Sequence, residues 1–347
     1  MKKKFTNIVV FLAVLLGVVI GMPVWSQNLV VNPSFENTSS CPVGISEFSK
    51  ALNWSPVNSG ADTCSSPDLY AACAPNIGGA NSPNALIGFQ NSRTGSHHAG
   101  IILYSGLALF SCNSLSGDLY REYIEGQVSS PLVAGQKYCV KFYVSLADNC
   151  KWGTDALGVY FSNNPIQYNF CNNNAPLPIT PQLDWCSAAV METDNWVEVR
   201  WSYIANGGEN YFTIGNFKSN NNTPLSNNNC SSFNSYAYYF IDDVSITPGC
   251  CPVDMAFTNI VQPTCGSNNG SINLGVANSP ICGESGSVSY LWSNGATTKN
   301  VANLAAGTYT VTVTNQGGCT ATLSTVLSNG GCCPTIVTMN TTAATCG

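Results

Sequence analysis

Cysteine is the residue that most constrains how this chain can fold. The sequence has 17 cysteines and only two histidines. No two cysteines form a Cys-x-x-Cys pair, so the spacing that a zinc site needs is missing. Cysteines at this density are typical of exported proteins, because disulfides persist on the oxidising side of a membrane. We therefore expect a chain crosslinked by disulfides, with one thiol left over because the count is odd.

The N-terminus has the pattern of a secretory signal peptide. Lys2, Lys3 and Lys4 precede an uncharged run from Ile8 to Ile20, which is shorter than the ~20 residues that a membrane span needs. Small residues then lead to an expected cleavage before Gln27, with an uncleaved anchor as the alternative. No later segment is long and apolar enough to span a bilayer. We therefore expect no transmembrane segment in the mature chain and a secreted or cell-surface location.

The charge balance narrows the class of partner. Without the three N-terminal lysines, nine basic residues stand against 18 acidic ones, a formal charge of −9. This excess argues against nucleic acid or an anionic membrane surface as a partner. Charged residues make up only 9% of the chain, against about 25% in an average soluble domain. Uncharged polar residues must therefore provide most of the solvent-exposed surface.

A repeated motif divides the chain. "CCPVDMAFTNIVQPTCG" begins at Cys250 and "CCPTIVTMNTTAATCG" begins at Cys332, a period near 80 residues that is typical of tandem domains. We predict a signal peptide over 1–26, one large domain over 27–249, a repeat over 250–331 and the start of a further repeat over 332–347. The last segment leaves Cys346 without its partner, which explains the odd count. A chance C-terminal tail is the alternative.

The complete repeat reads as short strands. Gly270–Val276 alternates apolar and polar residues, Val288–Trp292 ends at a Ser-Asn-Gly turn, and Gly307–Asn315 alternates valine with threonine. "GGCTATLSTV" follows as another strand. Short strands at this spacing, without a helical period, predict an immunoglobulin-like sandwich.

The same residues resemble a known family. "PTCGSNNGSINL…YLWSNGATTKNVANLAAGTYTVTVTNQGGCTATL" is similar to the SprB-type repeat of Bacteroidetes surface proteins, named for a gliding-motility adhesin. The resemblance implies a disulfide between Cys265 and Cys319, closing a loop of about 50 residues that would contribute about 4 kcal/mol in the chain-entropy model. Cys282, in an inserted "NSPICGESG", has no partner that the sequence assigns.

Residues 27–249 read as one β-domain. It opens with Asn28–Glu36 and closes with Tyr238–Ile246. The strand-like runs between them are Ala99–Tyr104, Tyr120–Val128, Lys137–Ala147, Ala156–Ser162, Trp196–Ala205 and Asn210–Phe217. The opening Asn-Pro-Ser-Phe-Glu and closing Ile-Asp-Asp-Val resemble the galactose-binding-like jelly roll of carbohydrate-binding modules, and the order of motifs resembles an N-terminal domain of exported Bacteroidetes proteins. The predicted fold class is all-β, a jelly-roll sandwich followed by an immunoglobulin-like repeat.

The acidic residues at the two ends of this domain suggest a metal. In such a jelly roll the first and last strands lie side by side, which would bring Glu36 near Asp242 and Asp243. Carboxylate oxygens suit Ca²⁺, and the resemblance implies a structural calcium ion there. The alternative is that Glu36 and the aspartates make local hydrogen bonds.

Aromatic residues are the candidates for ligand binding. Trp152, Trp185, Tyr236 and Tyr238 could stack on the apolar face of a sugar ring, and of the tryptophans we favour the two that lie in loops. For any single tryptophan, a core position is the alternative.

The sequence contains no catalytic motif and no marked pair of carboxylates, so we do not expect enzymatic activity in residues 1–347. The function that we expect is that of a cell-surface adhesin. Its head would bind glycan or another surface ligand, and a disulfide-stabilised stalk of repeats would carry the head. Export by the type IX pathway, calcium and partner proteins of the secretion machinery are implied by resemblance. A structural module that binds proteins, and the non-catalytic part of a larger secreted enzyme, remain alternatives.

Overall fold

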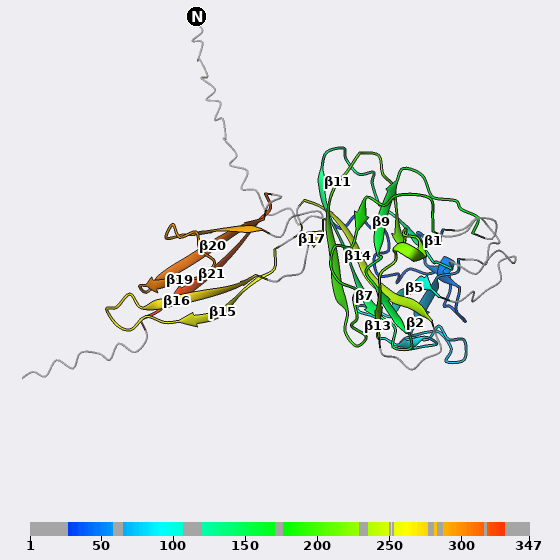
Figure 1. Cartoon of the computed structure of the whole chain (residues 1–347), viewed down its shortest axis with the longest axis horizontal. Coiled ribbons are helices and arrows are strands. Elements are labelled where there is room, and N and C mark those ends of the chain that lie inside the picture. Colours follow the sequence, from blue (N-terminus) through cyan, green and yellow to red (C-terminus); the bar gives the residue numbers. More distant parts are fainter. Residues whose placement is uncertain are drawn as a thin grey trace, which may run out of the picture.

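A computed structural model gives the structure of the chain over residues 27–57, 65–106, 120–170, 176–228, 235–249, 251, 253–276, 281–282, 287–315 and 318–329. The described part is all-β, with two short 3₁₀ turns, η1 (Phe48–Lys50) and η2 (Asn220–Asn222). The predicted fold class is therefore confirmed. Figure 1 shows a larger N-terminal unit, called the head below, from which a smaller second unit projects. The predicted signal peptide (1–26) and further repeat (332–347) lie outside the described residues.

The head is built on two sheets, one of five strands in the order β1-β6-β12-β9-β10 and one of six in the order β17-β11-β7-β14-β5-β2. The five-stranded sheet contains β1 (Trp54–Pro56), β6 (Ile124–Gln127), β12 (Tyr211–Gly215), β9 (Gly158–Ser162) and β10 (Leu183–Asp184). The six-stranded sheet contains β17 (Ile281–Cys282), β11 (Val197–Ile204), β7 (Lys137–Leu146), β14 (Tyr236–Pro248), β5 (His97–Ser105) and β2 (Asp68–Ala71). Two antiparallel two-stranded pairs complete the unit: β13 (Leu225–Asn227) with β8 (Trp152–Thr154), and the hairpin of β3 (Asn84–Ala85) with β4 (Gly88–Phe89).

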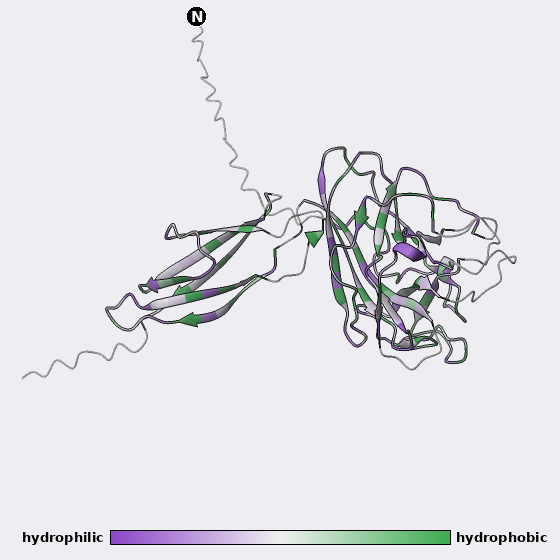
Figure 2. Ribbon diagram, viewed as in Figure 1, coloured by the Kyte–Doolittle hydropathy of each residue, from purple (hydrophilic) through white to green (hydrophobic). Residues whose placement is uncertain are grey.

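The core of the head lies between these two sheets. Because successive side chains of a strand point to opposite faces, Val159 and Phe161 of β9 face inward and are buried, whereas Tyr160 and Ser162 face outward. The Phe161 ring stacks on Tyr203 of β11 at a centroid distance of 4.3 Å, which joins the two sheets. The same alternation is visible along many strands in Figure 2.

The two ends of the head lie side by side, as the sequence predicts. The Leu29 N–H donates to the Ile246 carbonyl at 2.8 Å, and the Val244 N–H donates to the Pro33 carbonyl at 2.9 Å. The opening segment 28–36 is not a regular strand and pairs only through an isolated bridge between Val30 and Val128. Asn32 has a φ of 58° and is followed by proline, which lacks an N–H, so the ladder cannot continue.

The second unit is a sandwich of two three-stranded sheets. One has the order β15 (Met255–Val261), β16 (Gly270–Val276), β19 (Val301–Leu304); the other has the order β18 (Val288–Trp292), β20 (Gly307–Asn315), β21 (Thr320–Leu327). Their inner faces enclose a small core around Trp292, Val311 and Val313. The strands predicted at 270–276, 288–292 and 307–315 are confirmed, and β21 confirms the strand expected in "GGCTATLSTV".

Three disulfides join described residues: Cys41–Cys73, Cys139–Cys251 and Cys186–Cys282. Cys282, for which the sequence assigned no partner, therefore bonds to the head. Cys265 and Cys319 are each disulfide-bonded, but the pairing of these two with each other is wrong.

The geometry of β21 separates Cys265 from Cys319. Cys319 directly precedes β21, and the Lys137 Nζ of the head lies 3.8 Å from its Sγ. Cys265 follows Gln262, whose side chain accepts the Ser328 N–H beyond the other end of β21 at 2.7 Å. An eight-residue strand spans about 23 Å, whereas a disulfide needs Cα atoms within about 7 Å.

Candidate functional site

The candidate sugar-stacking residues are mostly in the core. Trp185 is 8% exposed and packs edge-to-face on Trp201 at 5.7 Å between ring centroids. Tyr236 and Tyr238 are 8% and 0% exposed. The expectation that these three rings are exposed is wrong: Trp185 packs between the two sheets, whereas Tyr238 lies on the opposite face of β14 from Tyr239 and is covered there by Asp68 and Tyr70 of β2. Trp152 is half-buried at the start of β8, with the Lys151 Nζ 4.8 Å from its ring centroid.

Tyr238 belongs to a buried polar network. Its hydroxyl donates to Asp68 Oδ2 at 2.5 Å and lies 2.8 Å from the Tyr70 hydroxyl. Glu122 is buried nearby and accepts the Ile102 N–H at 2.8 Å. Burial, and then the neighbouring Asp68, raise the pKa of Glu122 to about 8. Asp68, Tyr70 and Tyr238 are therefore buried on the face of the six-stranded sheet that points away from the five-stranded sheet.

The predicted calcium ligands lie around one loop, residues 93–97. Glu36 accepts the N–H groups of Ser96 and His97, both at 2.8 Å. Asp242 accepts the Arg93 N–H at 2.8 Å, and Asp243 forms an ion pair with the Arg93 guanidinium. The first and last parts of the head therefore clamp the same loop from two directions.

The two neighbouring aspartates at this loop have pKa values shifted in opposite directions. Burial, and then the neighbouring Asp243, raise the pKa of Asp242 to about 8. Hydrogen bonds from Ser34 and Thr94 and the ion pair with Arg93 outweigh burial and lower the pKa of Asp243. Among the described residues, no three acidic, histidine or cysteine side chains form a group that could hold a metal ion. The carboxylates already have protein partners, so this arrangement does not by itself fit Ca²⁺, and the calcium ion stays a prediction.

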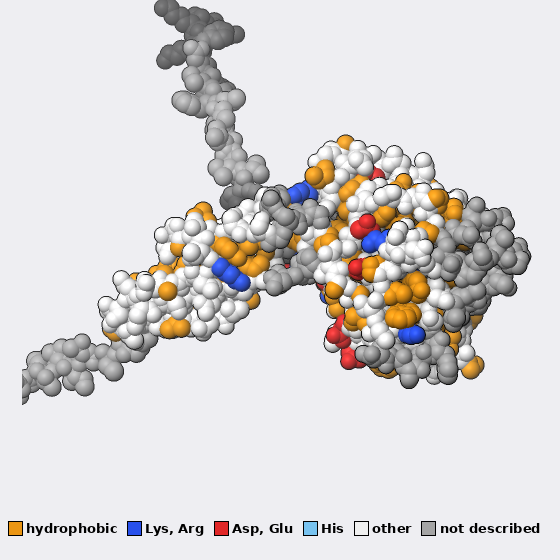
Figure 3. Space-filling model, in the orientation of Figure 1, with side chains coloured by type: hydrophobic (Ala, Val, Ile, Leu, Met, Phe, Trp, Pro, Cys, Tyr) orange, Lys and Arg blue, Asp and Glu red, His pale blue; other side chains and the backbone are white. Residues whose placement is uncertain are grey.

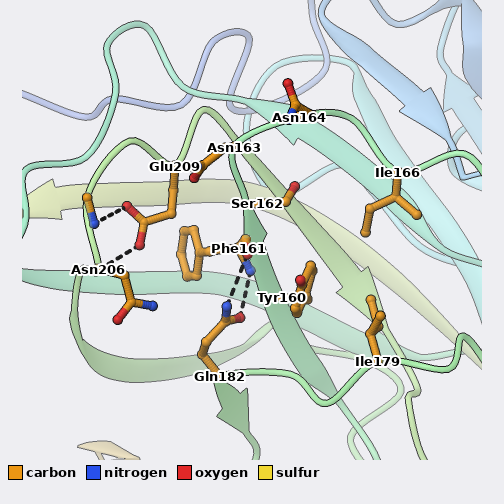
Figure 4. Close-up of a pocket in the computed structure, with 11 residues that line it drawn as sticks. Tyr160, Phe161, Ser162, Asn163, Asn164, Ile166, Ile179, Gln182, Asn206 and Glu209 are labelled. Atoms are coloured by element: carbon orange, nitrogen blue, oxygen red, sulfur yellow. Dashed lines mark hydrogen bonds between the residues drawn. The ribbon is translucent and has the colours of Figure 1, made fainter.

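One site with the shape of a pocket, formed by described residues, lies at the outer face of β9. It has a volume of about 510 Å³ and opens to solvent. The residues that line it come from β9, from the connection between β9 and β10 and from the turn between β11 and β12; they are Tyr160, Phe161, Ser162, Asn163, Asn164, Ile166, Ile179, Gln182, Asn206, Gly207 and Glu209. In Figure 4, Ile166 and Ile179 lie on one side of Tyr160, and Asn206 and Glu209 lie on the other.

The wall of the pocket is the chain that returns from β9 to β10. Part of it packs on the outer face of the five-stranded sheet, where Tyr123, Phe170, Leu177 and Phe217 form a second small cluster. The Leu177 N–H donates to the Tyr123 hydroxyl at 3.2 Å. This chain covers one end of the outer face and leaves the Tyr160 end open as a pocket.

A buried carboxylate supports the wall from below. Glu125 of β6 is 2% exposed and accepts the Ile166 N–H at 2.9 Å and the Thr213 hydroxyl at 3.2 Å. Burial raises the pKa of Glu125 to about 7, because these two hydrogen bonds offset only part of the desolvation cost. The strength of this support therefore depends on pH near neutrality.

Gln182 fixes the floor of the pocket. Its side-chain oxygen accepts the Phe161 N–H at 2.7 Å, and its NH₂ group donates to the Phe161 carbonyl at 3.0 Å. This paired bond satisfies the backbone of β9 beyond the end of the two-residue strand β10 (Figure 4).

Glu209 fixes the opposite rim. Its carboxylate accepts the Tyr203 hydroxyl at 2.7 Å and the N–H groups of Asn206 and Gly207 at 2.7 and 2.8 Å. Burial opposes its ionisation, but these hydrogen bonds outweigh burial and hold the pKa of Glu209 below its usual value. Glu209 is therefore a fixed anion that shapes a tight turn.

The described lining residues have the chemistry of a ligand-binding site rather than that of a glycosidase active site. Asn163, Asn164 and Asn206 are exposed, and each amide offers both a donor and an acceptor. Tyr160 adds a half-exposed ring. Glu209 is the single carboxylate of the lining and its oxygens are already engaged, whereas a glycosidase uses two opposed carboxyl groups.

Sequence reasoning missed these residues. The alternation in "GVYFS" shows that Tyr160 faces away from Val159 and Phe161, but no local signal distinguishes an outward tyrosine at a pocket from one on open surface. Gln182 lies in an irregular stretch between Pro181 and Leu183, where no periodicity applies.

No protein-family model and no curated protein matches the sequence. Among solved structures, the chain is similar to the xylan-binding domain CBM22-1 of Paenibacillus barcinonensis Xyn10C, with 14% identity, a TM-score of 0.31, and coverage of 65% of this chain and 97% of that one. It is also similar to the K1 cleaved adhesin domain of Lys-gingipain from Porphyromonas gingivalis W83, with 16% identity, a TM-score of 0.30, and coverage of 65% and 99%. The N-terminal cellulose-binding domain of Cellulomonas fimi β-1,4-glucanase C matches at 11% identity and a TM-score of 0.25, with coverage of 61% and 100%. At these scores the matches carry no argument about a ligand, and the all-β fold is established by the strands themselves.

Proposed function

We propose that this chain is an exported, adhesin-type surface protein whose head binds a neutral glycan in the pocket beside β9. The observation that carries the proposal is the composition of the described lining, which combines exposed amides with a tyrosine ring and two isoleucines. A sugar presents hydroxyl groups at its edge and C–H groups on its faces, and these match amides and an aromatic ring respectively.

The charge of the pocket selects the class of glycan. The described lining contains no lysine or arginine, and its one charged side chain is Glu209. The chain without residues 1–26 carries twice as many acidic as basic residues, and Figure 3 shows few charged side chains on the visible face. Uronic acids and sulfated sugars would therefore be repelled, which leaves neutral oligosaccharides as the ligand class.

The wider setting of this head is also a proposal. The sequence supports a signal peptide over 1–26, a secreted or surface location and a stalk of SprB-type repeats. Disulfides in the described part are compatible with an oxidising compartment. The described part contains no helix of the length and hydropathy needed to span a bilayer.

Binding of a panel of soluble oligosaccharides tests the glycan proposal. Isothermal titration of the full chain with neutral glucan, xylan, mannan and galactan fragments should show at least one ligand, and polygalacturonate fragments should not bind. Tyr160→Ala should weaken binding about tenfold or more, since it removes the ring, whereas Tyr160→Phe should retain most of the affinity. Tyr290→Ala, in β18 of the second unit, is the matched control. Equal affinities of Tyr160→Ala and the control would exclude this pocket as the binding site.

A further inference from the structure

The second unit contributes a strand to the head. Residues 281–282 form β17, which pairs in parallel with β11, with Ile281 opposite Arg200 and Cys282 opposite Trp201. Cys282 is 1% exposed and belongs to the hydrophobic core of the head rather than to that of the second unit. Ile281 and Cys282, which belong to the insertion in the SprB-type pattern, therefore lie on the sheet of the head, as the position of β17 in Figure 1 shows.

This strand is bonded covalently to the segment that follows β10. Cys282 forms a disulfide with Cys186, and its Sγ lies 3.0 Å from the Cys186 backbone N. A hydrogen bond holds β10 close to this disulfide, since the Trp201 Nε1–H of β11 donates to the Asp184 carbonyl at 2.8 Å. The disulfide therefore fixes the C-terminal end of β10.

The other end of β10 is the floor of the pocket. Gln182 directly precedes β10 and holds Phe161 of β9 through two hydrogen bonds. β10 itself has only two residues and is the edge of its sheet, and a short edge strand has little stability of its own. The position of Gln182 therefore depends on what holds the chain after Asp184.

A second anchor prevents the strand from drifting. Cys251 is disulfide-bonded to Cys139 of β7, so the start of the second unit is fixed to the same six-stranded sheet. Asp254 forms an ion pair with Arg200, which is 2% exposed and lies opposite Ile281. Two disulfides, a strand pairing and an ion pair thus join the second unit to the head.

We propose that residues 281–282 are a strap by which the second unit positions the floor of the head's ligand pocket, with Cys282 as a positioning residue. This inference rests on the proposed glycan site. It implies that the second unit is required for full affinity although the described pocket lining contains none of its residues. The binding site would then be rigid only when head and second unit are joined, which couples ligand binding to the integrity of the junction.

The double variant Cys186→Ala/Cys282→Ala of the full chain tests the strap, since it removes the disulfide without leaving a thiol at either position. The matched control is Cys41→Ala/Cys73→Ala, which removes another disulfide of the head whose two cysteines do not line the pocket. Amide hydrogen exchange should show about tenfold or greater loss of protection over 176–186 in the first variant only. Affinity for the neutral oligosaccharide should fall about tenfold in the first variant only, because the pocket loses its preorganisation.

The exchange and binding results can be distinguished. Unchanged protection over 176–186 would overturn the strap, whether or not any glycan binds. Lost protection with unchanged affinity for a glycan that the wild type binds would overturn the claim that the strap positions the pocket. Failure of the wild type to bind any oligosaccharide would refute the glycan proposal instead. If the double variant does not fold, partial reduction of folded wild type answers the same question, and affinity should fall in step with alkylation of Cys186.

Discussion

Glu125 gives the sharpest prediction about the support of the pocket wall. Its pKa rises from about 4.5 to about 7 on folding because the carboxyl is buried. An acid whose pKa is raised in the fold favours folding in its protonated form. The stability that it contributes is therefore complete below pH 4.5 and is lost as the pH rises through 7.

The magnitude follows from the size of the shift. At 1.36 kcal/mol per pKa unit, a rise of about 2.5 units corresponds to about 3 kcal/mol between pH 4 and pH 8. Glu125→Gln removes the ionisation and keeps an oxygen that can accept the Ile166 N–H. The variant should therefore be more stable than the wild type at pH 8 by up to about 3 kcal/mol, and nearly equal to it at pH 4.5.

Urea unfolding with the disulfides intact measures this difference at each pH. The difference between variant and wild type isolates Glu125 from Glu122 and Asp242, whose raised pKa values act in the same direction. Glu209→Gln is the control with the opposite sign, because its pKa is lowered in the fold and its ionised form is the stabilising one. A stability difference between Glu125→Gln and wild type that is the same at pH 4.5 and pH 8 would refute the reasoning.

Three further predictions concern stability. Trp54→Ala should lower the free energy of unfolding by about 3–5 kcal/mol, because the ring is buried against Phe35, Phe48 and Phe212; a loss below 1 kcal/mol in urea unfolding would contradict this packing. Gly126→Ala should cost about 1–3 kcal/mol, since a Cβ there would lie 2.5 Å from the Phe212 ring; an unchanged melting temperature would show that the sheet can yield. Millimolar Ca²⁺ should leave the melting temperature of the EDTA-treated chain nearly unchanged, because Glu36, Asp242 and Asp243 already have protein partners; a clear rise that Asp242→Asn abolishes would instead support the predicted calcium ion.

Much of the fold could be predicted from the sequence, since it depends on local alternation. Strands such as β20 and β7 are regular runs of β-branched and aromatic residues, and their positions follow from periodicity alone. The opening segment 28–36 has apolar residues that suit a strand, but Pro33 and the left-handed Asn32 prevent a regular one. The strand β17 could not be foreseen, because two residues carry no periodic signal and their partner strand lies in another unit.

The candidate site was predicted less well than the fold. Tryptophan and tyrosine suit both a core and a sugar-binding face, and the sequence does not say which side of a turn faces inward. Trp185 therefore looked like an exposed loop residue, although it packs on Trp201. The predicted pairing of Cys265 with Cys319 is wrong because a family pattern gives only the spacing of cysteines along the chain. It does not show that these two cysteines lie at opposite ends of the sandwich. The pocket itself is formed by residues from three separate segments, which only the three-dimensional structure brings together.

The most direct test of the glycan pocket is to locate a bound ligand by its effect on individual side chains. Heteronuclear NMR of the isotopically labelled chain, titrated with the tightest neutral oligosaccharide, reports the side-chain NH₂ signals of Asn163, Asn164, Gln182 and Asn206. We predict that these signals shift together and saturate with the titrated affinity. Saturable shifts confined to other residues, such as the indole of Trp152, would place the ligand elsewhere and contradict the account.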